Sequence, residues 1–275
     1  MRCPYPISIP NPAIKQNVIV EYRQDGTLLT SLGEILEPRS EVPCGHCMVC
    51  LENRREDWAT RMECESRTAA QTLFVTLTYS PEYCPDELKL LDLQKFCRRM
   101  RDKYGARYFA CGEYGGKFGR PHYHAIVWLP KYHDEDDSRA LVSSCWSFGF
   151  VMVREADRNA FRYVAKYTCK DVLDIPEGKQ PPFATMSRRP GIGFSYFNQI
   201  QDFEHEYILL ANGQRRSLPR YFLDKLDPVE KISIKRTRRI VAESMPQLSQ
   251  HMQVVKEQHF ERRLKRRYIE KYGKV

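Results

Sequence analysis

The sequence lacks three features that would each indicate another class of protein. No stretch approaches the ~18 consecutive apolar residues that a membrane-spanning helix needs. The start of the chain, residues 1–6, has no apolar core of a signal peptide, so we expect the protein to stay in the compartment where it is made. No Gly-x-x-x-x-Gly-Lys-Ser/Thr phosphate loop is present, so the sequence carries no recognisable ATPase.

Cysteine, by contrast, is plentiful, with 10 among 275 residues. In a small secreted chain that number would indicate a disulfide scaffold. Here the chain is long, and its 42% of hydrophobic residues can form a core without disulfides. We therefore interpret the cysteines as reduced thiols, some of them bound to a metal.

The net charge of +9 is unevenly distributed. Residues 228–275 contain 13 Lys and Arg against 5 Glu, which leaves a net +8 for this tail and +1 for all the rest. Such a tail predicts a polyanionic partner, most often nucleic acid, although a solvated charged helix is the simpler alternative. The candidate DNA-binding residues are Arg262, Arg263, Lys265, Arg266 and Arg267.

The best-patterned part of the chain predicts an α+β fold, with a central antiparallel sheet flanked by helices. Runs rich in β-branched and aromatic residues predict strands at 73–79, 107–111, 122–129 and 148–153. Asp92 is expected to cap a helix that Gly105 ends, and Asp157 to cap another that runs to about residue 172.

The same pattern divides the chain into four segments. We expect an N-terminal segment with a cysteine cluster and a helix at 1–72, and an endonuclease-like core at 73–175. A loop-rich linker follows at 176–227, and a basic helical tail at 228–275.

Two histidines, His122 and His124, lie two residues apart on a predicted strand. Side chains alternate along a strand, so both imidazoles point to the same face and supply half of a divalent metal site. Glu113, on the preceding strand, is the nearest carboxylate in the sequence that a hairpin can return to them. Taken alone, such a pair is more often a solvated strand face.

Two tyrosines, Tyr163 and Tyr167, lie at i and i+4 in a predicted helix, with Lys166 beside them. A tyrosine hydroxyl attacks a phosphate poorly without help, which a metal and a lysine can supply by neutralising charge on the phosphoryl oxygens. In isolation, an aromatic pair that packs on the sheet is the more common explanation.

Three further cysteines, Cys44, Cys47 and Cys50, have the C-x₂-C-x₂-C spacing of a metal site. A structural zinc ion needs a fourth ligand, for which the candidates are His46, Cys3 and Cys64. The spacing also matches the start of an iron–sulfur motif, and uncoordinated buried thiols are the remaining alternative.

In combination these patterns resemble a known family. Thr-Leu-Thr-Tyr at 76–79, Pro-His-Tyr-His at 121–124 and Tyr-Val-Ala-Lys-Tyr at 163–167 resemble the three motifs of the histidine–hydrophobe–histidine endonucleases that initiate rolling-circle replication. The two-tyrosine form is most similar to the replication-associated proteins of the gokushovirus branch of microviruses. Arg54, Trp58 and Arg61 after the cysteine cluster, and the stretch 187–193, also fit that branch. The resemblance covers residues 44–193.

The resemblance implies roles for the residues that match its motifs. His122 and His124 would hold Mg²⁺ or Mn²⁺, with Glu113 as the least secure third ligand. Tyr163 and Tyr167 would be nucleophiles that form 5′-phosphotyrosyl links and leave a free 3′-OH, and Lys166 would assist at the phosphate. The central position of the histidine motif is Tyr123 rather than an aliphatic residue.

The resemblance also implies partners. They would be single-stranded origin DNA, a host DNA polymerase that extends the 3′-OH and a host helicase, in the host bacterial cytoplasm, with no need for ATP or a membrane. The alternatives are a plasmid relaxase or single-strand transposase of the same chemistry, and a non-catalytic zinc-dependent nucleic-acid-binding protein.

Overall fold

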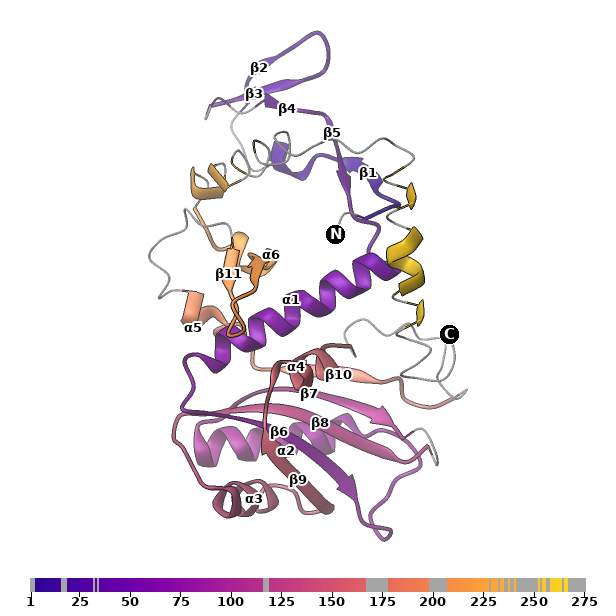
Figure 1. The fold of residues 1–275 in the computed structure, drawn as a ribbon, viewed down its shortest axis with the longest axis vertical. Helices are drawn as coiled ribbons and strands as arrows, with labels where there is room; N and C mark the ends of the chain where they lie inside the picture. The colour runs from indigo at the N-terminus through magenta and orange to yellow at the C-terminus, as the bar shows by residue number, and fades with distance from the viewer. Residues whose placement is uncertain are drawn as a thin grey trace. The chain divides into compact units, whose positions relative to one another are not determined.

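The computed structural model describes most of the chain: residues 3–15, 19–31, 33, 35–115, 119–166, 178–197 and 207–227, with short runs between 229 and 266. The chain forms two compact units (Figure 1). The first comprises Met1–Asn53 and Gln247–Val275, and the second Arg54–Pro246. Helix α1 (Met48–Ser66) begins in the first unit and continues in the second.

A five-stranded antiparallel sheet is the centre of the second unit. Its strands are β6 (Gln71–Tyr79), β7 (Arg107–Tyr114), β8 (Pro121–Leu129), β9 (Gly149–Glu155) and β10 (Phe183–Met186), in the order β10-β7-β8-β6-β9. The predicted antiparallel sheet is therefore confirmed. β10 lies in the stretch 176–193, where Pro and Gly suggested only a loop, and its backbone hydrogen bonds to β7 make it a strand.

Both faces of the sheet are covered, which explains why β8 is buried along nearly its whole length. On one face Val75 packs in a cluster with Phe96 of α2 (Leu90–Tyr104), beside α3 (Glu135–Ser143). On the other face Phe74 belongs to a cluster with Met62 of α1 and Phe161 of α4 (Arg158–Ala165). Figure 1 shows α2 behind the sheet and α4 in front of it.

The expected cap of α2 is wrong. The helix starts at Leu90, two residues before Asp92, and its N-cap Lys89 makes no side-chain cap bond. Asp92 instead accepts a hydrogen bond of 2.9 Å from the Tyr79 hydroxyl, since that buried group needs a partner. Gly105 ends the helix as expected, with the left-handed φ of 64° that favours glycine.

Helix α4 begins as predicted. The Asp157 side chain accepts from the Ala160 N–H at 2.8 Å, which caps the helix. The helix is described to Ala165, with Lys166 as its C-cap. The rest of the predicted helix, residues 167–172, lies outside the described residues.

The remaining elements are short ones that the sequence analysis did not identify. The first unit contains β1 (Ile7–Pro10) paired with β5 (Arg39–Val42), a 3₁₀ helix η1 (Pro12–Lys15), and a sheet of β2 (Ile19–Tyr22), β3 (Leu28–Thr30) and β4 (Ile35–Leu36). The second unit adds α5 (Phe194–Phe197), a hairpin of β11 (Tyr207–Leu209) and β12 (Arg215–Ser217), and α6 (Arg220–Leu223). None of the described helices is long and apolar enough to cross a membrane.

The close approach of β9 to β6 makes Gly149 a sensitive position. A Cβ atom there would lie 2.3 Å from the Ser80 backbone nitrogen and 2.5 Å from the Thr78 carbonyl oxygen. We expect Gly149→Ala to lower the free energy of unfolding by about 1–3 kcal/mol, because the backbone must shift. Urea denaturation measures it. Gly213→Ala, with no atom within 4 Å of the new Cβ, is the control; an equal loss in both would contradict the steric argument.

Candidate metal and tyrosine site

Strand register places the predicted metal ligands on one face of the sheet. Glu113 of β7 lies opposite His122 of β8, and His124 lies opposite both Cys111 of β7 and Thr76 of β6. Because side chains alternate along each strand, Glu113, His122 and His124 share a face. The hairpin between β7 and β8 thus returns the carboxylate to the histidines.

The three ligand atoms converge. Glu113 Oε1 lies 3.0 Å from His122 Nε2 and 2.8 Å from His124 Nε2, and all three atoms lie within 4.8 Å of one another. The other imidazole nitrogens have partners of their own: His124 Nδ1 is 3.0 Å from Thr76 Oγ1, and His122 Nδ1 is 3.2 Å from the Arg120 carbonyl oxygen. Such outer contacts orient the rings of metal-binding histidines.

This donor set fits a divalent cation. His122 Nδ1–H can donate to the Arg120 carbonyl, which leaves the lone pair of a neutral imidazole on Nε2, facing Glu113 Oε1. Two lone pairs 3.0 Å apart are stable only with a proton or a cation between them. Two imidazole nitrogens and a carboxylate oxygen therefore make Glu113, His122 and His124 a candidate metal-binding group.

The protonation states agree with that role. Burial raises the pKa of Glu113, but the hydrogen bonds to His122 and His124, together with the charge of Lys166, outweigh it and hold that pKa below its usual range. Burial lowers the pKa of His124. The carboxyl is therefore ionised and His124 neutral near pH 7, and these are the forms that bind a metal.

Tyr163 and Lys166 lie at the same place. The Tyr163 hydroxyl donates to Glu113 Oε1 at 2.5 Å and lies 3.4 Å from His124 Nε2. Lys166 Nζ lies 3.7 Å from Glu113 Oε2 and 3.9 Å from the centroid of the Tyr163 ring. One predicted nucleophile and the predicted lysine thus adjoin the candidate metal ligands. Tyr167 lies outside the described residues.

Buried ion pairs with α1 hold α4 in position, and the sequence analysis missed them. Arg158 lies 2.9 Å from Glu56 and 2.7 Å from Glu63, and Arg162 lies 2.6 Å from Glu56. The spacing carried a signal, since Arg158 and Arg162 are one helical turn apart and Glu56 and Glu63 two turns apart. Which helix faced which could not be read from it.

Two stretches that supported the resemblance meet in the second unit. The guanidinium of Arg61 lies between two aromatic rings, 4.2 Å from the centroid of Trp58 and 4.0 Å from that of Tyr221. Its Nε donates to the Ile192 carbonyl at 3.1 Å, which fastens the stretch 187–193 to α1. These residues therefore have a structural role close to α4.

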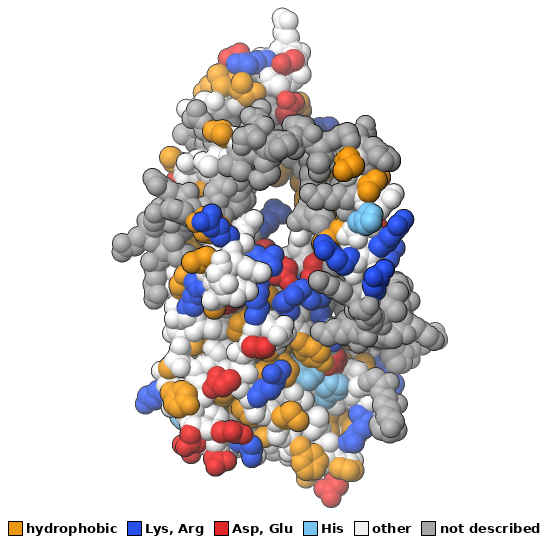
Figure 2. Space-filling view, in the orientation of Figure 1, with side chains coloured by type: hydrophobic (Ala, Val, Ile, Leu, Met, Phe, Trp, Pro, Cys, Tyr) orange, Lys and Arg blue, Asp and Glu red, His pale blue; other side chains and the backbone are white. Residues whose placement is uncertain are grey.

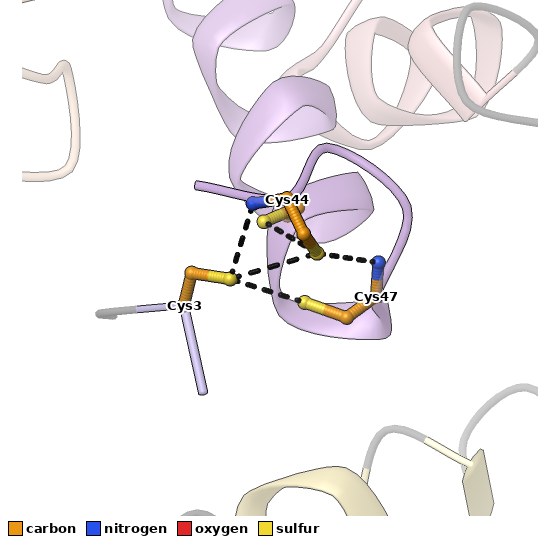
Figure 3. Close-up of side chains that lie close together, drawn as sticks. Cys3, Cys44 and Cys47 are labelled. Atoms are coloured by element: carbon orange, nitrogen blue, oxygen red, sulfur yellow. Dashed lines mark hydrogen bonds between the residues drawn. The ribbon is translucent and has the colours of Figure 1, made fainter. Parts of the chain in front are cut away.

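The cysteine cluster gathers four thiols in the first unit. They are Cys3, Cys44, Cys47 and Cys50, whose sulfur atoms all lie within 4.8 Å of one another. Figure 3 shows the sulfur atoms of Cys3, Cys44 and Cys47 pointing toward one another. Of the three candidates for a fourth ligand, Cys3 joins the cluster, while Cys64 is buried in an apolar cluster of the second unit.

The described basic residues of the tail are exposed. Arg262, Arg263, Lys265 and Arg266 are helical with solvent-exposed side chains, and Arg267 lies outside the described residues. Four exposed cations on a short helical stretch form a surface that a polyanion can contact.

Comparisons with known proteins agree with the motifs. The family described as replication-associated protein ORF2 matches residues 72–172, which include both histidines and both tyrosines of the site. The chain is 31% identical to "Replication-associated protein ORF4" of Chlamydia phage 1, over 67% of this chain and 53% of that protein. It is 26% identical to "Replication-associated protein ORF2" of Spiroplasma virus 4, over 81% and 79%.

The chain belongs to the replication-associated proteins of microviruses. A third relative, "Replication-associated protein VP4" of Bdellovibrio phage phiMH2K, is 25% identical over 66% of each chain. The family resemblance carried by the motifs is thereby confirmed. The chain spans about half the length of the Chlamydia phage protein, 53%, and 66% of the Bdellovibrio phage protein.

Thr76 offers a test of the metal site that leaves every ligand in place. We expect Thr76→Val to weaken Mn²⁺ binding by about 10- to 100-fold, because His124 loses the contact that orients its ring. Titration calorimetry or electron paramagnetic resonance of Mn²⁺ measures the affinity. Thr78→Val is the matched control on the same strand and face, since its hydroxyl bonds the Phe150 carbonyl. Equal affinities in the two variants would contradict the outer-contact role.

Proposed function

We propose that this chain initiates rolling-circle DNA replication by nicking one strand at a phage origin. The observation that carries the proposal is the Tyr163 hydroxyl, hydrogen-bonded at 2.5 Å to the carboxylate of the Glu113–His122–His124 group. A nucleophile beside a candidate metal site suits phosphoryl transfer. The match of residues 72–172 to a replication-associated family supports this reaction over others.

In the proposed reaction the Tyr163 oxygen attacks the scissile phosphorus. A Tyr–O–P bond forms, the P–O3′ bond breaks, and the 3′ oxygen takes up a proton as the tyrosine loses one to water. Glu113 orients the hydroxyl, and Lys166 neutralises charge on the phosphoryl oxygens. Mg²⁺ or Mn²⁺ held by His122, His124 and Glu113 would supply electrophilic activation of the phosphate.

The product stores the energy needed to close the strand again. The 5′-phosphotyrosyl bond can be attacked by a 3′-OH, which rejoins the DNA without ATP and releases a circular single strand. In this proposal Tyr167, four residues after Tyr163, is the second nucleophile, so one tyrosine can cut while the other holds the previous end. The five-stranded antiparallel sheet with this site on one face supports a histidine–hydrophobe–histidine endonuclease fold.

The other expected roles extend the same proposal. Residues 73–175 would be the catalytic core, and the basic tail at 228–275 would contact DNA phosphates through its exposed arginines and Lys265. A host polymerase would extend the 3′-OH, and a host helicase would separate the strands in the bacterial cytoplasm.

The covalent intermediate is the decisive test. With Mn²⁺ and a single-stranded oligonucleotide covering the phage origin, we expect cleavage and a protein adduct on the 5′ side of the cut, identified by mass spectrometry. The double variant Tyr163→Phe/Tyr167→Phe should form neither product. His122→Ala/His124→Ala should lose cleavage and keep its thermal unfolding midpoint.

Tyr132→Phe, at an exposed tyrosine outside the site, is the matched control and should cut like the wild type. Cleavage by the double tyrosine variant at the wild-type rate would overturn the proposed chemistry. Salt-dependent binding without any cleavage would favour a non-catalytic nucleic-acid-binding protein instead.

A further inference from the structure

We propose that Cys3, Cys44, Cys47 and Cys50 bind one zinc ion as a tetrahedral four-thiolate site. The Cys3 sulfur lies 3.6 Å from that of Cys44 and 3.8 Å from that of Cys47, and the sulfurs of Cys44 and Cys50 are 3.9 Å apart. With Zn–S bonds of about 2.3 Å, the edges of a regular tetrahedron of sulfurs are about 3.8 Å long. The thiols are therefore already spaced as zinc ligands.

The fold brings these cysteines together from three places in the chain. Cys3 precedes β1, Cys44 and Cys47 follow β5, and Cys50 lies in the first turn of α1. The ladder between β1 and β5 bridges the 41 residues that separate Cys3 from Cys44. The fourth ligand thus depends on a strand pairing.

Backbone groups stabilise charge on the sulfurs. The N–H groups of Tyr5 and Cys44 each point at the Cys3 sulfur at 3.4 Å, and that of Cys47 points at the Cys44 sulfur at 3.4 Å. Hydrogen bonds of this kind favour thiolates, which are the form that binds a metal.

The geometry separates zinc from the alternatives. The shortest of these sulfur–sulfur distances, 3.6 Å, is far longer than the bond of about 2.05 Å in a disulfide. In an iron–sulfur cluster the cysteines bind different irons, which spreads their sulfurs apart. Here all four sulfurs lie within 4.8 Å of one another, as a single ion requires.

The first unit also needs such a cross-link. Its described residues include few buried hydrophobic side chains, whereas several of its large ones are exposed: Tyr5, Ile7, Val20, Tyr22 and Ile35. A small unit with so little core is stabilised by a metal or by disulfides. One zinc ion would tie the N-terminus, β5 and the start of α1 to one point.

Metal analysis of the purified full chain tests the site. We expect one zinc per chain in the wild type by mass spectrometry of the metal content, and strong sulfur-to-cobalt charge transfer after exchange with Co²⁺. Cys3→Ser should lose zinc or bind it at least 10-fold more weakly. Cys3→His should keep a tetrahedral cobalt spectrum with weaker charge transfer, since one thiolate is replaced by an imidazole.

Cys84→Ser, at another partly buried cysteine, is the control and should bind zinc like the wild type. A wild-type chain that takes up neither zinc nor cobalt would overturn the proposal, and so would Cys3→Ser with unchanged affinity. Stoichiometric iron with acid-labile sulfide would replace it with a cluster. Because nicking is measured separately, these outcomes do not depend on the proposed function.

A second inference rests on that function: we propose that Phe150 and Met152 of β9 form a platform on which bases of the bound DNA strand stack. Register places them on the face of the sheet that carries the site. Thr78 of β6 pairs with both Phe150 and His122, and Thr76 pairs with both Met152 and His124. Each platform residue thus lies two strands, about 10 Å, from a histidine.

These side chains have no burial to explain them. Phe150 is 65% and Met152 66% exposed, whereas the next residue, Val153, packs in the core on the opposite face. β9 is also an edge of the described sheet, so a strand of DNA can reach it. Figure 2 shows hydrophobic and basic side chains beside a histidine surface over the sheet.

The charge beside the platform favours nucleic acid as the occupant. Arg154 follows on the same face of β9, with its guanidinium 4.6 Å from the centroid of the Phe74 ring. Lys166 lies on the other side, at Glu113. Exposed apolar side chains between cations match a single strand, whose bases stack while its phosphates pair with the charges.

Alanine substitution tests the platform without disturbing the core. We expect Phe150→Ala and Met152→Ala each to weaken binding of a fluorescent single-stranded oligonucleotide by about 5- to 100-fold in anisotropy titrations. Phe150→Trp should restore binding, because any flat ring can stack. Tyr132→Ala, at a side chain 71% exposed past the far end of β8, should bind like the wild type.

The two proposals fail differently. If the wild type neither binds nor cuts single-stranded DNA, the proposed function is wrong. If it cuts, and Phe150→Ala and Met152→Ala bind as tightly as Tyr132→Ala, only the platform is wrong.

Discussion

The second unit is organised around one buried negative charge, the carboxylate of Glu113. An ionised carboxylate removed from water is destabilising unless opposite charge and hydrogen bonds compensate it. Here one oxygen faces two imidazoles and the Tyr163 hydroxyl, and Lys166 approaches the other. The groups that satisfy the charge are those that can bind a cation and present a nucleophile, so stability and chemistry require the same contacts.

A second set of charges determines whether the tyrosine reaches that carboxylate. Glu56 and Glu63 of α1 fasten α4 through Arg158 and Arg162, and the cap at Asp157 sets where the helix begins. Loss of one partner of a buried pair leaves the other uncompensated. The precision of the site therefore depends on α1, which contributes no residue to it.

Much of the candidate site followed from local periodicity. Two-residue spacing on a strand puts His122 and His124 on one face whatever surrounds the strand, and the glycine-rich turn after Glu113 indicated the hairpin. The errors came where distant groups compete with local ones. Asp92 has the composition of a helix cap, yet the buried Tyr79 hydroxyl claims its carboxylate, and the loop-like stretch before residue 193 contains β10.

The sequence by itself determined the antiparallel core strands, the paired histidines, the start of α4 and the family, because each depends on spacings of a few residues. Only the tertiary structure decided which carboxylate meets the histidines, that Tyr163 reaches it, and that Cys3 rather than His46 or Cys64 completes the four thiols. Those partners lie up to 50 residues apart along the chain. Their meeting follows from strand register and helix packing, which no local pattern contains.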